Sequence, residues 1–287
     1  MKPSPFVYHA PATVADAAGV LREHADEAKV LAGGQSLVPM MSLRLASFGH
    51  LVDLNRVTGL DEITRSNGHV RVGALVRQSV AEHDPTVGTD VPMLARALPH
   101  IGHFQIRNRG TVGGSIAHAD PASELPAVVC ALDAILEASS ADGSRDIAAA
   151  DFFESTWQTA LADDEILTAV RFPVWSGRSG FAVEEVTRRH GDFAICGAVC
   201  GVQRSGDSVT RAAIALFGVG ATPIRAREAE AALVAAGAGA DLAAIGQEAA
   251  AGLEPGDDLH ASGAYRRTVG AVVVRRALSR ALEEAGS

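Results

Sequence analysis

Two glycine pairs, Gly33-Gly34 and Gly113-Gly114, restrict what this chain can fold into more than any other feature. The first pair directly follows the apolar run Val30-Leu31-Ala32, and the second lies in a polar stretch from residue 102 to residue 115. Glycine has no Cβ and tolerates a positive φ, so each pair predicts a tight turn at which the backbone can approach a ligand. Successive N–H groups in such a turn form a concave anion site. Two such turns could therefore hold the two phosphates of a dinucleotide.

Short glycine motifs also recur by chance, and for either pair alone a plain structural turn is the stronger interpretation. Neither segment matches the G-x-G-x-x-G dinucleotide fingerprint or the G-x-x-x-x-G-K-[ST] phosphate loop. The sequence therefore disfavours a nicotinamide dehydrogenase and an ordinary nucleotidase.

Length and charge narrow the class of protein. A chain of 287 residues is longer than most single cores, so two domains are expected. The net charge of -9 and the lack of a basic stripe argue against a nucleic-acid binder. No signal peptide and no membrane-spanning run of about 18 apolar residues are found. Three cysteines are too few for a disulfide framework, and a reducing cytoplasm fits them best.

The pattern of apolar residues predicts an α+β protein rather than a regular βαβ series. In the first part, helices are predicted after Thr13 and at residues 77–83, 92–99 and 122–131, and strands at 6–9, 29–31, 51–54, 70–72, 132–138 and 166–172. The stretch 173–180, with a proline and two glycines, is the best linker candidate. After it, three antiparallel strands are predicted at 181–187, 194–203 and 209–219, and alanine-rich helices at 225–251 and 261–284.

The residues that surround each glycine pair identify a protein family more specifically than the glycine spacing alone. The run from Ala32 to Pro39, AGGQSLVP, and the run from Ile106 to Pro121, IRNRGTVGGSIAHADP, closely resemble the FAD-binding medium subunits of molybdenum hydroxylases. That family includes the medium subunit of aerobic carbon monoxide dehydrogenase and the flavin domain of xanthine dehydrogenase. Similar segments follow in the same order along nearly the whole chain, at 51–54, 164–167 and 188–194. Because the similar segments occur in the same order, together they support a family assignment that neither glycine motif supports alone.

The resemblance implies a two-part FAD-binding domain over residues 1–176, with subdomains of about 1–56 and 57–176. A smaller α+β domain, with a three-stranded antiparallel sheet and helices, is implied for residues 177–287. It also implies that a defined set of residues contacts FAD. These are Val30, Leu31, Ala32, Gly33, Gly34, Gln35, Ser36, Leu37, Ile101, Thr111, Gly113, Gly114, Ser115, Glu124, Leu167 and Phe193.

Two of these positions depart from the family pattern. Phe193 stands where some relatives have a tyrosine beside the isoalloxazine, so a hydroxyl is missing here. Gln35 stands where many relatives have a histidine, which keeps a hydrogen-bond donor but removes a titratable group. The substitution of Gly114 by alanine is expected to expel FAD, on the view that this glycine has a positive φ and lies against the pyrophosphate.

By the same resemblance, the chain is an electron-transfer subunit with no catalytic residue for substrate turnover. A large partner subunit would carry the molybdenum cofactor and a small one two [2Fe–2S] clusters, in a dimer of heterotrimers. Electrons would pass through FAD to a quinone or another acceptor. Carbon monoxide is the first expectation for the substrate, with xanthines, aldehydes and N-heterocycles as alternatives. The resemblance fits a cytoplasmic protein, including one held at the inner face of the membrane.

Several other residues favour plain structural interpretations. His100 and His103 lack a third metal ligand in the sequence, and no metal site is expected. Cys196 and Cys200 share a strand face and are expected to be buried thiols. Trp157 and Trp175 are expected to be packing residues. For Arg107 and Arg109, a solvated surface, a partner contact and support of the cofactor all remain open.

Two alternative functions are also compatible with the sequence. A self-contained flavin oxidase would need a substrate cavity with a catalytic base, and residues 177–287 are short for that. A non-catalytic assembly or nucleotide-sensing protein with the same fold would retain no flavin.

Overall fold

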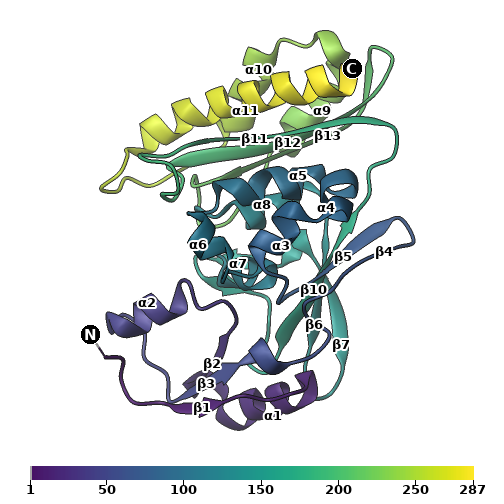
Figure 1. Ribbon diagram of the computed structural model, residues 1–287. Helices are drawn as coiled ribbons and strands as arrows, with labels where there is room; N and C mark the ends of the chain where they lie inside the picture. Colours follow the sequence, from purple (N-terminus) through teal and green to yellow (C-terminus); the bar gives the residue numbers. More distant parts are fainter. Residues whose placement is uncertain (1) are drawn as a thin grey trace.

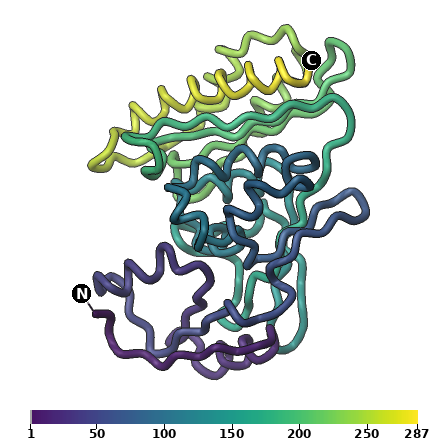
Figure 2. Tube along the Cα trace, in the orientation of Figure 1, coloured from purple at the N-terminus to yellow at the C-terminus, as the bar shows by residue number. Residues whose placement is uncertain are grey.

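The computed structural model describes residues 2–287 and contains three packed units (Figure 1). The two chain ends lie at opposite ends of the molecule, as the trace in Figure 2 shows. The α+β prediction is confirmed, and every strand predicted in the first part of the chain is present within a few residues.

The N-terminal unit is a three-stranded parallel sheet in the order β1-β3-β2. Its strands are β1 (Val7–His9), β2 (Ala28–Leu31) and β3 (His50–Asp53), with helices α1 (Val14–His24) and α2 (Leu37–Ser42). As predicted, Thr13 caps α1, because its hydroxyl accepts a hydrogen bond from the Asp16 N–H at 3.1 Å. The buried face of α1 packs with Val52 of the sheet and forms a small core.

The middle unit is a five-stranded antiparallel sheet covered by short helices (Figure 1). The strand order is β4 (Ile63–Ser66), β5 (His69–Gly73), β10 (Ile166–Pro173), β6 (Ile135–Ser139) and β7 (Ser144–Ala148). The helices are α3 (Gln78–His83), α4 (Pro85–Asp90), α5 (Pro92–Ala97), α6 (Phe104–Arg107), α7 (Val112–His118) and α8 (Glu124–Ala131). A hairpin of β8 (Phe153–Ser155) and β9 (Gln158–Thr159) completes it.

The C-terminal unit is an antiparallel sheet between two layers of helices (Figure 1). Its strands are β11 (Arg178–Val186), β12 (Cys196–Ser205), β13 (Ser208–Phe217) and β14 (Ile224–Arg225), and its helices are α9 (Arg227–Ala236), α10 (Leu242–Ala251) and α11 (Gly263–Gly286). The two-residue strand β14 adds a fourth member to the predicted three-stranded sheet. Within residues 2–287, single 3-10 turns occur at 25–27, 54–56, 98–100, 149–151 and 237–239.

Strand β12 is buried on both faces. Ala198 and Cys200 lie in the core beneath α9–α11, whereas Val199 lies in the core shared with the middle unit. Cys196 and Cys200 have no exposed surface, so the prediction of buried thiols is confirmed. This sheet therefore joins the last unit to the rest of the chain through a continuous apolar layer.

Both tryptophans pack against neighbouring side chains, as predicted, but only Trp175 does so in the interior. Trp175 is buried, with Phe181 against its edge and the Arg211 guanidinium over its ring. Trp157 is 58% exposed, stacks on His118 and donates a hydrogen bond to Asp120 at 3.2 Å. Its φ of 59° places it in a tight turn of the β8–β9 hairpin, which holds the ring at the surface.

Candidate cofactor site

The first glycine segment has the predicted turn geometry. Strand β2 ends at Leu31, Gly34 has a φ of 73°, and Ser36 begins helix α2. The Gln35 side chain bends back and donates to the Gly33 carbonyl at 3.2 Å. Within residues 2–287, the backbone N–H groups of Gly33, Gly34, Gln35 and Ser36 have no acceptor. Four consecutive free donors in this turn are compatible with the anion site expected from the sequence.

The second glycine pair is not a turn, which corrects the sequence prediction. Gly113 and Gly114 form the first turn of α7, and neither has a positive φ. Thr111 caps the helix by accepting a hydrogen bond from the Gly114 N–H at 3.0 Å. The Gly113 N–H donates to the Ala74 carbonyl at 3.0 Å, and the Ser115 N–H to that of Thr111 at 3.1 Å. These donors are already satisfied, so the second segment is no open N–H cradle.

Close packing explains the second glycine pair instead. A Cβ on Gly113 would lie 2.6 Å from the Ala74 Cα, and one on Gly114 would lie 2.6 Å from the Thr111 hydroxyl and 3.3 Å from the Ala32 Cβ. Gly33 in turn lies against the backbone of Arg109 and Gly110. The fold therefore brings the two glycine segments into direct contact.

Two polar side chains that the sequence analysis missed tie these segments together. Asn55 donates to the Ala32 carbonyl at 2.9 Å and accepts a hydrogen bond from Arg77 at 2.5 Å. The same guanidinium donates to the carbonyl of Arg109. We call the pair Asn55 and Arg77 the clasp. Its residues lie far from both segments in the sequence, so no local pattern could have indicated it.

Other predicted residues lie outside the two segments. Leu167, on β10, is buried, and its neighbour Thr168 accepts a hydrogen bond from Ala74, which also bonds Gly113. Ile101 is packed against the core of the middle unit. Phe193 is 65% exposed in the β11–β12 connection, which rests on the turn before α6 because Gly191 packs against His103.

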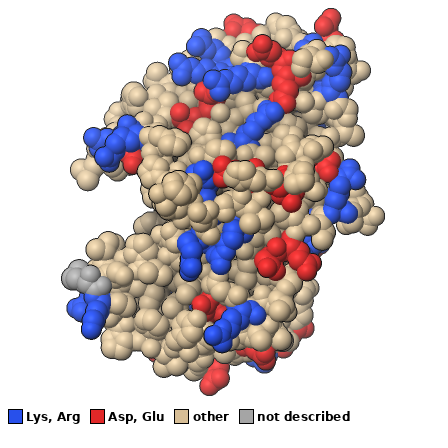
Figure 3. All heavy atoms as spheres, in the orientation of Figure 1, with Lys and Arg blue, Asp and Glu red and all other residues tan. Residues whose placement is uncertain are grey.

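Figure 3 shows the surface notched on this side of the molecule, between α2 below and α6 with the β11–β12 connection above. The notch therefore opens between elements of all three units. Exposed arginines Arg188 and Arg189 line a cavity of about 370 Å³ in the β11–β12 connection.

Glu124, at the start of α8, is 6% exposed. Burial raises the pKa of its carboxyl group to about 8, and the nearby Glu185 carboxylate adds to the effect. Glu124 is therefore mainly protonated at neutral pH and can donate a hydrogen bond. A buried neutral carboxyl group is suited to hold a hydroxyl-bearing ligand.

The other singled-out residues have structural roles. Arg107 is mostly buried, pairs with Glu82 at 2.7 Å and donates to the Ile101 carbonyl at 3.1 Å, which excludes a solvated surface role. The Arg109 side chain is exposed. His100 pairs with Glu185 at 3.1 Å, and this hydrogen bond raises the pKa of His100.

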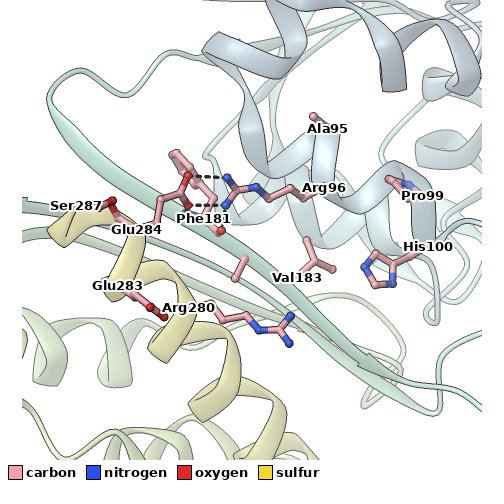
Figure 4. Close-up of a pocket in the computed structure, with 11 residues that line it drawn as sticks. Ala95, Arg96, Pro99, His100, Phe181, Val183, Arg280, Glu283, Glu284 and Ser287 are labelled. Carbon is pink, nitrogen blue, oxygen red and sulfur yellow. Dashed lines mark hydrogen bonds and ion pairs between the residues drawn. The ribbon is translucent and has the colours of Figure 1, made fainter.

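A second, larger groove of about 810 Å³ lies between α5, β11 and α11 (Figure 4). In it, Arg96 forms two hydrogen bonds with the Glu284 carboxylate at 2.5 and 2.6 Å. None of the predicted cofactor residues lines this groove.

Comparison with known proteins agrees with this geometry. Residues 4–175 match the family described as "FAD binding domain in molybdopterin dehydrogenase", and residues 181–281 match "CO dehydrogenase flavoprotein C-terminal domain". The chain belongs to the FAD-binding medium subunits of molybdenum hydroxylases. The open N–H groups after β2 fit this assignment, because they offer an anion site suited to a pyrophosphate.

Relatives of this family match the chain over almost its whole length. The alpha subunit of the 6-hydroxypseudooxynicotine dehydrogenase complex of Paenarthrobacter nicotinovorans is 40% identical, over 99% of this chain and 97% of its own. The carbon monoxide dehydrogenase medium chain of Hydrogenophaga pseudoflava is 35% identical, over 98% of each chain. A solved structure of carbon monoxide dehydrogenase from that organism superposes with a TM-score of 0.96, at 37% identity and 99% coverage of both chains. In residues 2–287, no helix combines the length and apolar character needed to cross a membrane.

Proposed function

We propose that this chain holds FAD between its two glycine segments and serves as the electron-transfer subunit of a molybdenum-dependent hydroxylase. The observation that carries the proposal is the run of four backbone N–H groups, Gly33 to Ser36, that lack an acceptor. They supply the donors that a pyrophosphate needs without a lysine. Membership of the medium-subunit family supports the same assignment.

We assign these predicted residues roles in FAD binding that are compatible with their positions in the structure. The N–H groups of the first segment bind the pyrophosphate, flanked by Val30, Leu31 and Leu37. The Ser115 hydroxyl approaches from the second segment, where glycine lets the helix come close. Thr111 accepts from Gly114, so its own hydroxyl proton remains available to donate.

The apolar and acidic residues complete the site. Ile101 and Leu167 would supply apolar contacts to bound FAD, and the neutral Glu124 carboxyl group would hold its sugar portion. Phe193, exposed in the β11–β12 connection, would contact the isoalloxazine ring of bound FAD through its apolar side chain and would offer it no hydrogen bond.

Bound FAD supplies a centre that accepts single electrons and releases them in pairs. This chain positions that centre and leaves the oxidation of substrate to its partners. Its own cysteines are buried or half-buried within secondary structure and are not arranged to hold an iron–sulfur cluster. By similarity to the family, [2Fe–2S] clusters of a small subunit and molybdenum of a large subunit would supply the electrons.

The assembly and its location are further parts of the proposal. By similarity to the family, two copies of each subunit form a dimer of heterotrimers, and a quinone or another carrier accepts the electrons. A quinone acceptor would place the complex in the cytoplasm at the inner face of the membrane. We assign the chain a FAD-binding domain at residues 1–176 and a C-terminal domain at 177–287. The family matches at 4–175 and 181–281 support that division.

This chain carries little information on the substrate of the complex, because the substrate contacts lie in another subunit. Carbon monoxide is supported by the similarity to a carbon monoxide dehydrogenase medium chain. The 40% identity to a 6-hydroxypseudooxynicotine dehydrogenase subunit favours an organic substrate instead. Assays of the complex with each compound and an artificial electron acceptor distinguish the two.

The test of the function is purification of the native complex through a tag on this chain. We expect co-purification of two further subunits, a flavin absorption spectrum and one FAD for each copy of this chain. A colourless complex without FAD would overturn the proposal and favour an assembly or sensing role. A lone yellow protein that oxidises a substrate without partners would favour a self-contained flavin oxidase.

A further inference from the structure

Three histidines from distant parts of the sequence meet at one edge of the N-terminal unit. His9 ends β1, His24 ends α1 and His50 begins β3, elements that lie together at the base of the molecule (Figure 1). The proposed cofactor site uses none of them. Because they are widely separated in the chain, the sequence showed no metal-ligand spacing.

The three side chains converge closely. One ring nitrogen from each lies within 4.8 Å of the other two. His9 Nε2 lies 3.0 Å from His50 Nδ1, and the rings of His24 and His50 stack with their centroids 3.5 Å apart. All three residues are half-buried, so the group is held by the fold yet accessible from solvent.

A carboxylate also lies beside the three rings. Glu23 Oε1 is 4.0 Å from His24 Nε2. Neutral imidazole is the form that binds metal, and it offers one lone pair on each ring.

The spacing fits a transition metal. A Zn–N bond is about 2.0–2.1 Å, so nitrogens around a tetrahedral zinc are about 3.3 Å apart. The 3.0 Å separation of His9 and His50 is close to this value. Because the rings of His24 and His50 are stacked, one of them must turn about its Cβ–Cγ bond to direct its lone pair at the same ion.

We propose that His9, His24 and His50 bind a divalent transition metal of the zinc class, with water or the Glu23 carboxylate as the fourth ligand. Imidazole nitrogens suit zinc, copper and nickel far better than calcium or magnesium. The bound ion would link β1, α1 and β3, and so hold the first strand of the chain to the sheet. The site is structural rather than catalytic.

The metal site is independent of the cofactor site. His50 pairs with Ala28 at the start of β2, whereas the first glycine segment follows Leu31 at the other end of that strand. Loss of the metal ligands should therefore leave flavin content unchanged. The experiments can therefore contradict the metal site without contradicting FAD binding, and the reverse also holds.

The test is zinc content and thermal stability of the purified complex. Treatment with a chelator is followed by dialysis against micromolar ZnCl2, and zinc is measured by mass spectrometry alongside flavin absorbance. The variants are His24→Ala and His50→Gln. The control is His69→Ala, an exposed histidine of β5 outside the cluster.

In the wild type and the His69→Ala control, we expect one zinc per copy of this chain and a higher melting temperature with zinc than without it. Either cluster variant should weaken zinc binding by more than about 100-fold, because loss of outer-shell partners alone costs about 10–100-fold. It should also lose the zinc-dependent rise in melting temperature, with flavin content retained. Failure of the wild type to bind zinc, or equal binding by the cluster variants, would overturn the proposal.

Discussion

Gly33 lies directly against the backbone of Gly110, so that a Cβ at residue 33 would be 2.8 Å from the Gly110 Cα. This contact sets the distance between the two glycine segments. The neighbouring loop therefore requires a glycine at residue 33.

The substitution Gly33→Ala should push the segments apart and reduce FAD binding. Overpacking against backbone costs about 1–3 kcal/mol, which corresponds to about 5- to 150-fold weaker binding. Titration of apoprotein with FAD, followed by fluorescence quenching, measures the dissociation constant. The control is Gly88→Ala, in α4, where a Cβ meets nothing within 4 Å. Unchanged affinity in Gly33→Ala would show that the spacing of the segments is unimportant.

The clasp should contribute to cofactor affinity without touching the cofactor. In Asn55→Ala, the Ala32 carbonyl and the Arg77 guanidinium each lose a partner. With about 0.5–1.5 kcal/mol for each hydrogen bond, we expect about tenfold weaker FAD binding. The neighbouring exposed Arg56→Ala variant should bind as the wild type does. Equal FAD affinities of the wild type, Asn55→Ala and Arg56→Ala, measured by the same titration, would show that the clasp does not contribute to FAD binding.

Glu124 should make the stability of the apoprotein depend on pH. Its pKa rises from 4.5 to about 8 on folding, so the folded state retains a proton that the unfolded state has lost in this window. The free energy of unfolding therefore falls as pH rises from about 4.5 to about 8, by about 1.4 kcal/mol per pH unit from this group. The Glu124→Gln variant lacks that contribution. Its stability relative to the wild type should rise with pH in urea denaturation, and parallel curves would contradict the assignment.

The cysteines should be unreactive in the folded protein. Burial raises the pKa of Cys130 and of Cys196 to about 12, and that of Cys200 is raised as well. Thiolate is the reactive form, so a chromogenic disulfide reagent should label no thiol at pH 8 before unfolding. In denaturant it should label all three. Rapid labelling of the folded protein would show that α8 or β12 opens readily.

The sequence predicts elements well where local chemistry and packing agree. The continuous apolar run of β10 and the Thr13 cap of α1 are both present as expected. Helix α7 was missed because glycine has a low helix propensity, and only the Thr111 cap and the contact with Ala74 reveal why two glycines begin a helix.

In the candidate site, too, the local features are predicted from the sequence and the long-range contacts are not. The open N–H groups of the first segment follow from a strand that ends in two glycines. By contrast, the clasp depends on Asn55 and Arg77 reaching residues more than 20 positions away, at separations of 23 and 32. Such contacts are set by the tertiary fold, and a single sequence contains no local signal for them.

The different states of the two segments have a consequence for amide hydrogen exchange. The N–H groups of Gly113 and Gly114 are already bonded within the protein, whereas those of Gly33 and Gly34 are not. The second segment is therefore preorganised, and its amides should exchange slowly with or without the cofactor. Those of the first segment should exchange quickly in the apoprotein and become protected when FAD binds. One side of the site is thus a fixed template, and the ordering of the other is coupled to the arrival of the ligand.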